Sequence, residues 1–505
     1  MKNTINYHDK SKEELLEIIV NQSKQIQLLE ETVLAYRLRQ FANKSEKLNT
    51  QQISLFDEAE LPKSIEKIQE AEEEISVASY TRKTPGRKPL PKELPRVAKI
   101  YDLAETEKIC ACGCLLTHIK DEKSEQLEII PAKIYVIEHI RKKYACKQCE
   151  ETIKTAPQPL QPIPRSIASS GLLSHVLVSK FVDHLPLFRQ ENIFKRIGID
   201  IPRATLSLWV IRCAELLNPL MKLLHDIIIS YDIAYADETT VQVIKEPNKS
   251  IQSKKYMWLF SGGRPEQFVF YYQYHPSRSH EVVLQFFEDF KGYLHCDGFS
   301  AYDALAKMNP EIYLSGCLYH VRRYFMEVIK ISKAKEGIAI DVIKYITQLA
   351  NIEEDIKDFL PEKKYQIRLE KAHPLLNELH RYLLGNQSRV PPKSLLGKAI
   401  SYALNQWRKL LIYLNDGRLE NNNNRSERAI KPFVIGRKGW LFSNSVAGAH
   451  AAATIFSLAG TCKYHSIEPY NYFRYVLSAL PQCQTVTDYE ALLPFNLDKK
   501  LMNHD

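Results

Sequence analysis

Strand character marks two stretches of the chain that also carry carboxylates, IAYADETTVQVI (233–244) and GYLHCDG (292–298). Both are rich in β-branched and aromatic residues with partial alternation, which is the pattern of strands in a sheet. Two further stretches between them, KYMWLFSGG (255–263) and QFVFYYQYH (267–275), share this composition. Helical patterns lie before and after this region. The sequence therefore predicts a multidomain α+β protein with a sheet-bearing core.

Three carboxylates stand out in this core. Asp237 lies inside the first stretch after buried-type residues, where a charged side chain needs a reason. Asp297 closes the second stretch, at the carboxyl end of a neighbouring strand, where it can meet Asp237. Glu427 lies in NNNNRSERAIKPF, at the start of a predicted helix. Carboxylates on two strands and a helix form the constellation that holds two Mg²⁺ or Mn²⁺ ions in phosphoryl-transfer enzymes.

The surroundings of these residues bear on the assignment. The chain has 60 acidic residues, so a trio of this kind also arises by chance. Glu238 should point to the opposite face of the strand from Asp237, and it is the weaker candidate ligand. The residues around Glu427 are basic, amide-rich and aromatic, which suits a metal ligand that faces a nucleic-acid backbone. We therefore predict DNA contacts at Arg425, Arg428, Lys431, Arg437, Lys438 and Trp440.

Length and charge set further bounds. A chain of 505 residues has room for about three or four domains. Its 69 Lys and Arg residues against 60 Asp and Glu residues give a net charge of +9. The net charge is small because an acidic segment at 57–74 offsets the positive charge of basic segments at 81–99 and 425–438. No apolar run suits a membrane span and the N-terminus has no signal-peptide core, so we expect a cytoplasmic protein without a membrane partner.

We expect six segments along the chain. These are a helical, coiled-coil N-terminus (1–50), an acidic and then basic Pro-rich linker (51–99), a cysteine-rich module expected to bind zinc (100–155), a helical region expected to bind DNA (167–230), the sheet-bearing core expected to be catalytic (231–465) with a helical insertion expected at about 326–415, and a C-terminal tail (466–505).

Residues 11–48 carry a heptad pattern. Its seam positions recur at alternating spacings of four and three, at Leu15, Ile19, Gln22, Ile26, Leu29, Val33 and Tyr36. β-Branched residues at one seam position and leucines at the other favour a parallel two-stranded coiled coil. An amphipathic helix that packs on its own chain explains the pattern equally well.

The stretch TRKTPGRKPLPKELPRVAK (81–99) is basic and contains four prolines, which preclude a regular helix. An extended linker of this kind can track phosphates, and we assign Arg87 and Lys88 to DNA contact. A solvated spacer is the alternative interpretation.

Five of the ten cysteines lie within residues 110–149. Cys146 and Cys149 form a CxxC pair, and Cys110 and Cys112 form a tight CxCG pair. Two such pairs suit a closed tetrahedral site for structural Zn²⁺. We set Cys114 aside because Cys112-Gly-Cys114 is less turn-like. Reduced, buried cysteines without metal are the alternative.

A helix-turn-helix pattern follows the zinc-binding module. The amphipathic stretch LFRQENIFKRIG (187–198) ends at a glycine, and a second helix begins at Pro202. Arg203, Thr205 and Ser207 lie near the start of this helix, as do the residues that read the major groove of DNA. Helix–glycine–helix corners are also common in all-α domains that bind no DNA.

Ordered matches along nearly the whole chain resemble the insertion-sequence-66 family of bacterial transposases. The longest are SEQLEIIPAKIYVIEHIRKKYACKQC (124–149), PLFRQENIFKRIGIDIPRATLSLWV (186–210) and NNNNRSERAIKPFVIGRKGWLFSNSVAGAHAAATIFSLAGTCK (421–463). Shorter matches include PGRKPLPKELPRV (85–97) and GCLYHVRRYF (316–325).

The resemblance implies a ribonuclease-H-like catalytic core with an Asp-Asp-Glu triad on Asp237, Asp297 and Glu427. The zinc ligands of the family fall on Cys110, Cys112, Cys146 and Cys149, and Cys114 stands where the family usually has a glycine. His320, with Arg322 and Arg323, matches a family motif, for which we expect helix packing and phosphate contact.

The activity implied by the resemblance is DNA transposition. Water would cut the transposon end, and the freed 3′-hydroxyl would then attack target DNA, so that one pair of Mg²⁺ or Mn²⁺ ions serves both phosphoryl transfers. The implied partners are the terminal inverted repeats, target DNA, further copies of the chain such as a dimer, and companion proteins of the element, at the bacterial nucleoid. A DNA-binding remnant or repressor without catalysis and a nuclease of the same fold are the alternatives.

Overall fold

The computed structural model describes residues 134–145, 153–155, 157, 159–333 and 335–497, together with the single helical residues Gln22, Leu29 and Val33. The chain separates into a unit formed by 68–158 and a unit formed by the rest. In the first unit, β1 (Lys143–Ala145) pairs antiparallel with β2 (Ile153–Thr155). All further description concerns the second unit from residue 159 onward.

Several predictions from the sequence lie outside the described residues. Apart from the three single residues, these include the heptad helix, the linker with Arg87 and Lys88, and the zinc cysteines Cys110, Cys112, Cys146 and Cys149. The predicted coiled coil and zinc site therefore stay predictions.

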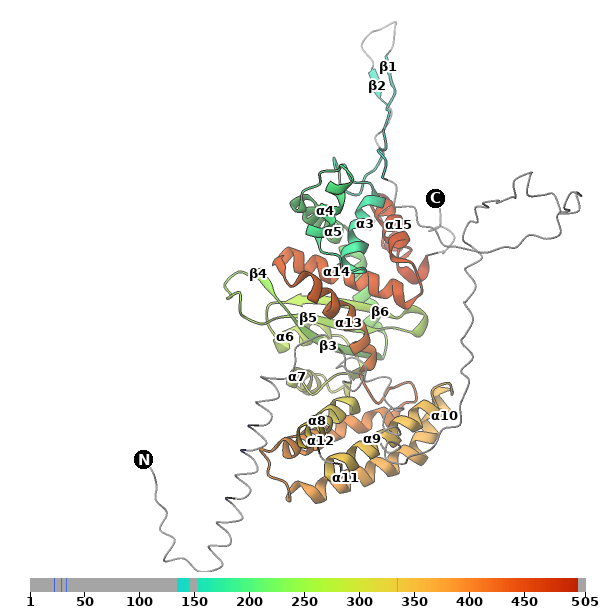
Figure 1. Ribbon diagram of the computed structural model, residues 1–505. Coiled ribbons are helices and arrows are strands. Elements are labelled where there is room, and N and C mark those ends of the chain that lie inside the picture. Colours follow the sequence, from blue (N-terminus) through green and yellow to red (C-terminus); the bar gives the residue numbers. More distant parts are fainter. Residues whose placement is uncertain are drawn as a thin grey trace, which may run out of the picture. The chain divides into compact units, whose positions relative to one another are not determined.

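A five-stranded mixed sheet forms the centre of the second unit (Figure 1). Its strands are β3 (Ile233–Val241), β5 (Lys255–Gly262), β6 (Val269–His275), β7 (Gly292–His295) and β8 (Ile312–Ser315). The spatial order is β6-β5-β3-β7-β8. Strands β3, β5 and β6 run antiparallel in sequence, whereas β7 and β8 lie parallel to β3. Outside this sheet, β4 (Val243–Lys245) pairs in parallel with β9 (Ser443–Ser445).

Helices make up most of the remaining described chain. They are α3 (Ser170–Phe181), α4 (Leu187–Arg196), α5 (Arg203–Ser230), α6 (His280–Phe286), α7 (Ser300–Met308), α8 (Leu318–Ser332), α9 (Ile338–Asp355), α10 (Pro361–Ile367), α11 (His373–Gln387), α12 (Leu395–Leu411), α13 (Asn424–Trp440), α14 (Val446–Tyr464), α15 (Pro469–Ala479) and α16 (Val486–Glu490). None of the described helices is both long and apolar enough to cross a membrane.

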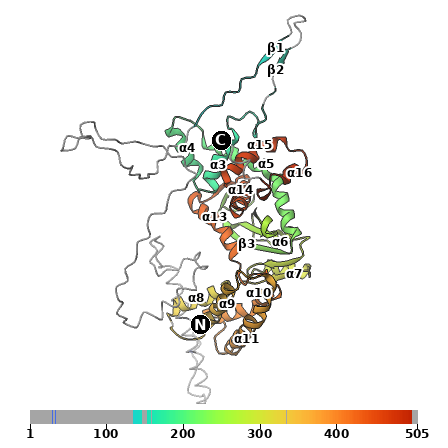
Figure 2. The same cartoon turned by 90° about the vertical axis from the view of Figure 1, so that its right-hand side faces the viewer.

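The two faces of the sheet are covered by different helices. Side chains alternate along a strand, so the paired residues Asp237, Leu259 and Tyr272 share one face. Helix α13 lies on this face (Figures 1 and 2), where the hydroxyl of Tyr272 donates a hydrogen bond to the carbonyl of Ala429 in the helix. On the opposite face, the ring of Phe260 stacks on Phe286 of α6 at 3.9 Å between centroids.

Helix α14 covers the free edge of β6. The backbone N–H of Phe270 donates to the Thr461 hydroxyl at 3.1 Å, and that of Tyr272 donates to the Ser457 hydroxyl at 2.7 Å. An edge strand with free N–H groups is a template for aggregation, and side-chain acceptors on a covering helix remove that hazard. Small residues let the helix approach this closely, among them Gly460 beside the Phe270 ring.

The segment after residue 465 differs from the tail that the sequence predicted. Helix α15 packs against α3, and its Tyr472 and Phe473 are fully buried. The Tyr472 hydroxyl donates to the carbonyl of Leu492 at 3.1 Å. Because this helix carries a buried apolar stripe, residues 469–497 are part of the folded unit.

The start of β7 is fixed by a close backbone approach. Gly292 has φ +130°, and a Cβ there would lie 2.2 Å from the carbonyl oxygen of Asp232. The next residue, Tyr293, donates its N–H to the same oxygen at 2.8 Å. Only glycine combines this dihedral angle with this contact. The position of β7 beside β3, and with it that of Asp297, depends on this glycine.

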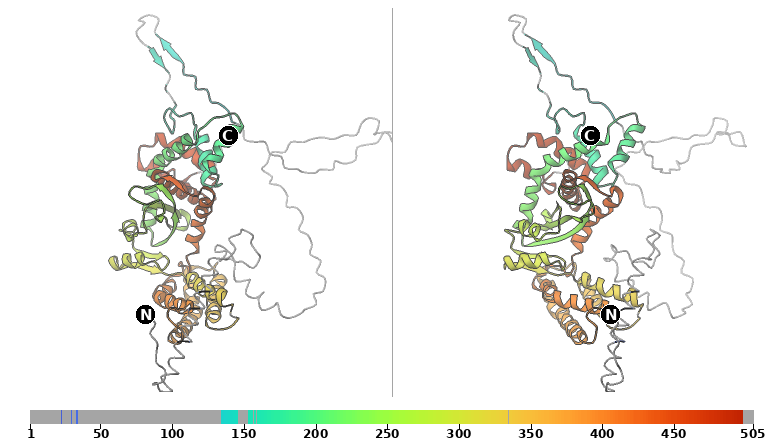
Figure 3. Two further views of the ribbon diagram at one scale, coloured as in Figure 1. Left: turned by 60° about the vertical axis from the view of Figure 1, so that its left-hand side comes forward. Right: turned by 90° about the vertical axis from the view of Figure 1, so that its left-hand side faces the viewer.

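Helices α8 to α12 occupy the region for which the sequence predicts a helical insertion at about 326–415, and the first of them begins earlier, at Leu318. They pack against one another, α12 contacts β8, and Figure 3 shows these yellow to orange helices gathered together. Arg368 lies among these helices, in a π-helical turn between α10 and α11. Its guanidinium forms an ion pair with Glu353 at 2.6 Å and donates to the carbonyls of Tyr413, Asp416 and Leu419. Arg368 thereby ties the insertion to the loop that leads into α13.

We expect Arg368→Ala to lower the free energy of unfolding by about 3–5 kcal/mol, because it leaves several buried acceptors without a donor. Urea unfolding of the full chain measures this change. Lys357→Ala is the matched control, since Lys357 and its partner Glu354 are exposed, and we expect no measurable change in its free energy of unfolding. Equal losses in both variants would contradict the role given to Arg368.

Candidate active site

The register of two parallel strands places two of the predicted carboxylates side by side. Tyr235 of β3 pairs with His295 of β7. Asp237 follows Tyr235 by two residues, and Asp297 follows His295 by two residues. Because the two strands are parallel, both carboxylates lie at the same level of the sheet. The Asp297 side chain is 25% exposed, and its Oδ1 accepts the N–H of Phe299 at 2.9 Å in the turn that leads to α7.

Helix α13 brings the third carboxylate over the same face. Glu427 lies in the first turn of this helix. The side-chain amide of Asn423, directly before the helix, donates to the carbonyl of Ala236 at 3.1 Å. The contact of Tyr272 with Ala429 holds the next turn above β6. The helix is therefore anchored to the sheet on both sides of Glu427.

The charges of three neighbouring carboxylates act on Asp237. The pKa of Asp237 is raised well above its usual value, chiefly by burial and then by the negative charges of Glu238, Asp297 and Glu427. Burial and like charge both disfavour the ionised form. A carboxylate whose pKa is raised by neighbouring carboxylates belongs to a donor set of the kind that a divalent cation would neutralise.

Glu238 lies beside this cluster, with partners of its own. As predicted for the opposite strand face, it contacts α7, where the Tyr302 hydroxyl donates to its Oε2 at 3.2 Å. The Arg278 guanidinium donates through Nε to Glu238 Oε1 at 2.7 Å and lies 3.7 Å from Asp297 Oδ2. Burial and the charge of Asp297 raise the pKa of Glu238 to about 7, against the opposing effect of Arg278.

Arg278 is a site residue that the sequence did not reveal. It sits between β6 and α6, stacked on the ring of Phe299 at 3.8 Å. Its carboxylate partners lie on other strands, and the local sequence HPSRSH carries no periodic signal that points to them. The arginine places one positive charge next to Asp297.

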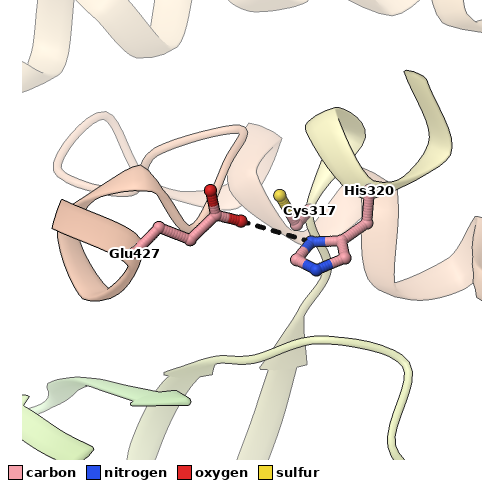
Figure 4. Close-up of side chains that lie close together, drawn as sticks. All are labelled: Cys317, His320 and Glu427. Carbon is pink, nitrogen blue, oxygen red and sulfur yellow. Dashed lines mark ion pairs between the residues drawn. The ribbon is translucent and has the colours of Figure 1, made fainter. Parts of the chain in front are cut away.

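Two more potential ligands adjoin Glu427. His320 of α8 has its Nδ1 3.7 Å from Glu427 Oε1 (Figure 4). Donor atoms of Cys317, His320 and Glu427 lie within 4.8 Å of one another. Burial and the nearby Arg323 lower the pKa of His320 to about 4, although Asp297 acts in the opposite direction. The imidazole is therefore neutral at pH 7.

The basic residues predicted to contact DNA divide into two groups. Arg425 forms an ion pair with Glu420 at 2.8 Å, and Arg437 donates to the Thr240 carbonyl of β3. Arg428 and Lys438, in contrast, are exposed on α13, and Lys431 is half-buried. The first two arginines thus fix the helix to its surroundings, whereas Arg428 and Lys438 face solvent.

Trp440 is half-buried at the end of α13. Its ring meets the ring of Phe433 edge-on at 5.6 Å, and the ammonium of Lys180 lies 5.6 Å from its centroid. The residue predicted to stack on DNA thus has intramolecular partners for its ring.

Helices α4 and α5 occupy the positions expected for the helix-turn-helix. Gly198, with φ +83°, ends the first helix, and Pro202 caps the second. Arg203 is exposed, and Thr205 and Ser207 are half-buried. Helix α5 continues to Ser230, and its later turns pack against the sheet.

Comparison with known protein families agrees with this architecture. Residues 165–451 match the model of the "Transposase IS66 family". Residues 107–150 match the "zinc-finger binding domain of transposase IS66", and residues 457–495 match the "IS66 C-terminal element". Residues 28–98 match "Transposase C of IS166 homeodomain".

Two relatives cover most of the chain. The uncharacterized protein y4jD of Sinorhizobium fredii is 32% identical over 423 residues, which span 81% of each chain. The uncharacterized protein y4qI of the same organism is 30% identical over 477 residues, which span 90% of this chain and 86% of the relative. With four ordered family matches, the chain belongs to the IS66 family of transposases.

Proposed function

We propose that this transposase cuts DNA at transposon ends and joins them to target DNA by metal-dependent phosphoryl transfer, with Asp237, Asp297 and Glu427 as its catalytic triad. One observation carries the proposal: Asp237 and Asp297 lie at one level of two paired strands, Glu427 lies on the helix over that face, and the charges of Asp297 and Glu427 raise the pKa of Asp237. Such convergence has no structural benefit in a protein without cations, because like charges at close range destabilise the fold.

The sheet topology supports a ribonuclease-H-like core. Three antiparallel strands followed by two parallel ones place the first carboxylate on the central strand and the second after its parallel neighbour. The third comes from a helix on the same face. We propose that α8 to α12 are an insertion into this core, between β8 and α13.

The donor set fits two Mg²⁺ or Mn²⁺ ions, since hard carboxylate oxygens suit both. When bound, the ions would neutralise the scissile phosphate and lower the pKa of the attacking hydroxyl. The chain itself supplies rigid support: the Phe299 N–H orients Asp297, and Asn423 fixes the start of α13. Arg278 partly balances the negative charge beside Asp297.

We propose that DNA contacts this site through Arg428, Lys431 and Lys438, because they lie on the helix that carries Glu427. Arg425, Arg437 and Trp440 support that helix through their intramolecular contacts. The start of α5, with Arg203, Thr205 and Ser207, is the proposed reader of transposon-end sequence, and Arg87 and Lys88 add phosphate contacts. We also propose assembly as a homo-oligomer such as a dimer through a coiled-coil N-terminus, with companion proteins of the element, at the nucleoid.

Incubation of the protein with duplex DNA of the terminal repeats and Mg²⁺ tests the proposed activity. We expect free 3′-hydroxyl ends and joined products, both of which EDTA prevents. Free ends that accumulate without joining would instead indicate a nuclease, and binding without any nicking would indicate a DNA-binding remnant or repressor.

The proposed zinc ligands Cys110, Cys112, Cys146 and Cys149 make a separate prediction. We expect Cys146→Ser to reduce bound zinc from about one ion per chain to nearly none, because a structural site needs all four thiolates. Metal analysis after dialysis measures this content. Cys114→Ser is the control and should keep its zinc, and a loss as large as that of Cys146→Ser would mean that the ligand set is wrong.

A further inference from the structure

The β8–α8 junction and the start of α13 are tied together directly. Cys317 precedes α8, and its Sγ accepts the N–H of Asn423 at 3.2 Å. The N–H of Leu318, the first residue of α8, donates to the carbonyl of Asn421 at 3.0 Å. Both bonds reach the asparagine turn from which α13 begins. The beginnings of the two helices are therefore held in a fixed relation.

The fixed arrangement of α8 and α13 places the side chain of His320 next to Glu427. His320 lies in the first turn of α8, and its side chain is only 12% exposed. Its Nδ1 is 3.7 Å from Glu427 Oε1 and has no hydrogen-bond partner among the described residues (Figure 4). A buried ring nitrogen without a partner is costly to leave in place. The separation exceeds a hydrogen bond, but such contacts often tighten only when the site is loaded.

We propose that His320 is a positioning residue that donates a hydrogen bond from Nδ1 to one oxygen of Glu427 and so orients the other oxygen toward the divalent ion. The proposal rests on the proposed function, in which Glu427 is a metal ligand. Carboxylate ligands are commonly held by a neighbouring hydrogen-bonding group, and loss of that group costs about 10–100-fold in metal affinity or activity. Here the group comes from the helical insertion, so the insertion completes the site.

Cys317, His320 and Glu427 could alternatively form an ion site of their own, since Zn²⁺ accepts such a mixed donor set. The geometry favours positioning for two reasons. The Cys317 sulfur is buried and already accepts a backbone N–H, and its replacement as acceptor would release the start of α13. Glu427 also lies close enough for its charge to raise the pKa of Asp237, which associates it with the carboxylate cluster.

Two substitutions of His320 in the full-length protein test the proposal. His320→Leu keeps the bulk but removes the donor, whereas His320→Asn places an amide N–H near the position of Nδ1. We expect Leu to raise the Mg²⁺ concentration for half-maximal DNA cleavage about 10–100-fold, and Asn to restore most of the wild-type value. An unchanged Mg²⁺ curve for His320→Leu, or equal impairment in both variants, would overturn the proposal.

Metal binding without DNA provides a readout that is independent of activity. Electron paramagnetic resonance of free Mn²⁺ gives the dissociation constant, and we expect His320→Leu to weaken it about 10–100-fold. In a Glu427→Gln background, His320→Leu should not change the Mn²⁺ dissociation constant further. A further weakening of Mn²⁺ binding as large as that in the wild-type background would overturn the proposal. If the wild type cuts no DNA, the proposed function fails, while this binding comparison still decides the role of His320.

Cobalt binding separates positioning from direct ligation by the cysteine. With zinc already loaded, added Co²⁺ should give the same spectrum in the wild type and in Cys317→Ser. A sulfur-to-cobalt charge-transfer band that disappears in Cys317→Ser would show a mixed Cys–His–Glu ion site and would overturn the positioning role.

Discussion

Asp237→Asn is expected to lower the rate of DNA cleavage by at least about 10³-fold while the protein stays folded. Stabilisation of the transition state by a bound ion is worth several kcal/mol, and about 4 kcal/mol corresponds to about 10³-fold in rate. Asp237 stands on the central strand, and the charges of Asp297 after β7 and Glu427 on α13 both act on it. An amide of the same shape keeps the packing but binds a divalent cation poorly.

The matched control for this prediction is Asp289→Asn. Asp289 is an exposed carboxylate between α6 and β7, outside the triad. We expect its loss to leave cleavage within about twofold of the wild type, because exposed charges away from a site contribute little. Cleavage by Asp237→Asn at the rate of this control would show that Asp237 is no ligand. Circular dichroism of both variants verifies that they are folded.

The second large effect concerns stability in the absence of metal. The folded protein raises the pKa of Asp237 well above 3.8 and that of Glu238 from 4.5 to about 7. The folded state therefore holds these protons more tightly than the unfolded chain does, so stability falls as pH rises from about 4 through 7. For Glu238 alone, the shift corresponds to about 3 kcal/mol lost across this window.

Thermal unfolding in EDTA between pH 5 and pH 8 measures this effect. Asp237→Asn should gain stability relative to the wild type as pH rises, because only the wild-type carboxyl has to give up a proton that the folded state holds tightly. Mg²⁺ should stabilise the wild type at pH 8, by about 2.7 kcal/mol at 100 times its dissociation constant. Parallel pH curves for the two proteins would contradict the shared carboxylate site.

The three carboxylates of the candidate site could be selected from the sequence because each carries a local signal. Asp237 interrupts an apolar strand, and Asp297 follows another strand at the position where parallel neighbours meet. Glu427 lies in a basic helix start whose composition differs from a solvated face. The sequence predicts these residues one at a time, whereas the register between β3 and β7 brings two of them together.

Other elements escape prediction for physical reasons. Strand β8 has only four residues, IYLS, among helical patterns, and a run this short has no clear period. Arg278 contacts Glu238 40 residues away along the chain, so no local pattern records the pair. The apolar spacing of Tyr472, Phe473 and Val476 did carry a helical signal, which shows that the C-terminal segment could have been predicted as a helix.

The intramolecular contacts of the basic residues on α13 could not be predicted either. Composition shows that the segment is positively charged, but whether a guanidinium faces DNA or a neighbouring strand depends on how the helix is rotated on the sheet. Arg437 reaches β3 and Arg428 faces solvent, although both belong to the same charged run.

The central claim is that the three carboxylates hold the ions that act on DNA, and a change of ligand atom tests it most directly. In Asp297→Cys, a thiolate replaces the carboxylate. Mg²⁺ binds sulfur poorly, whereas softer divalent ions such as Mn²⁺ accept it more readily. We predict that this variant cuts terminal-repeat DNA when Mn²⁺ is the divalent ion. In Mg²⁺, we predict that it cuts at least about 10³-fold more slowly than the wild type does in Mg²⁺. Cleavage at the wild-type rate in Mg²⁺ would contradict the assignment of Asp297 as a metal ligand.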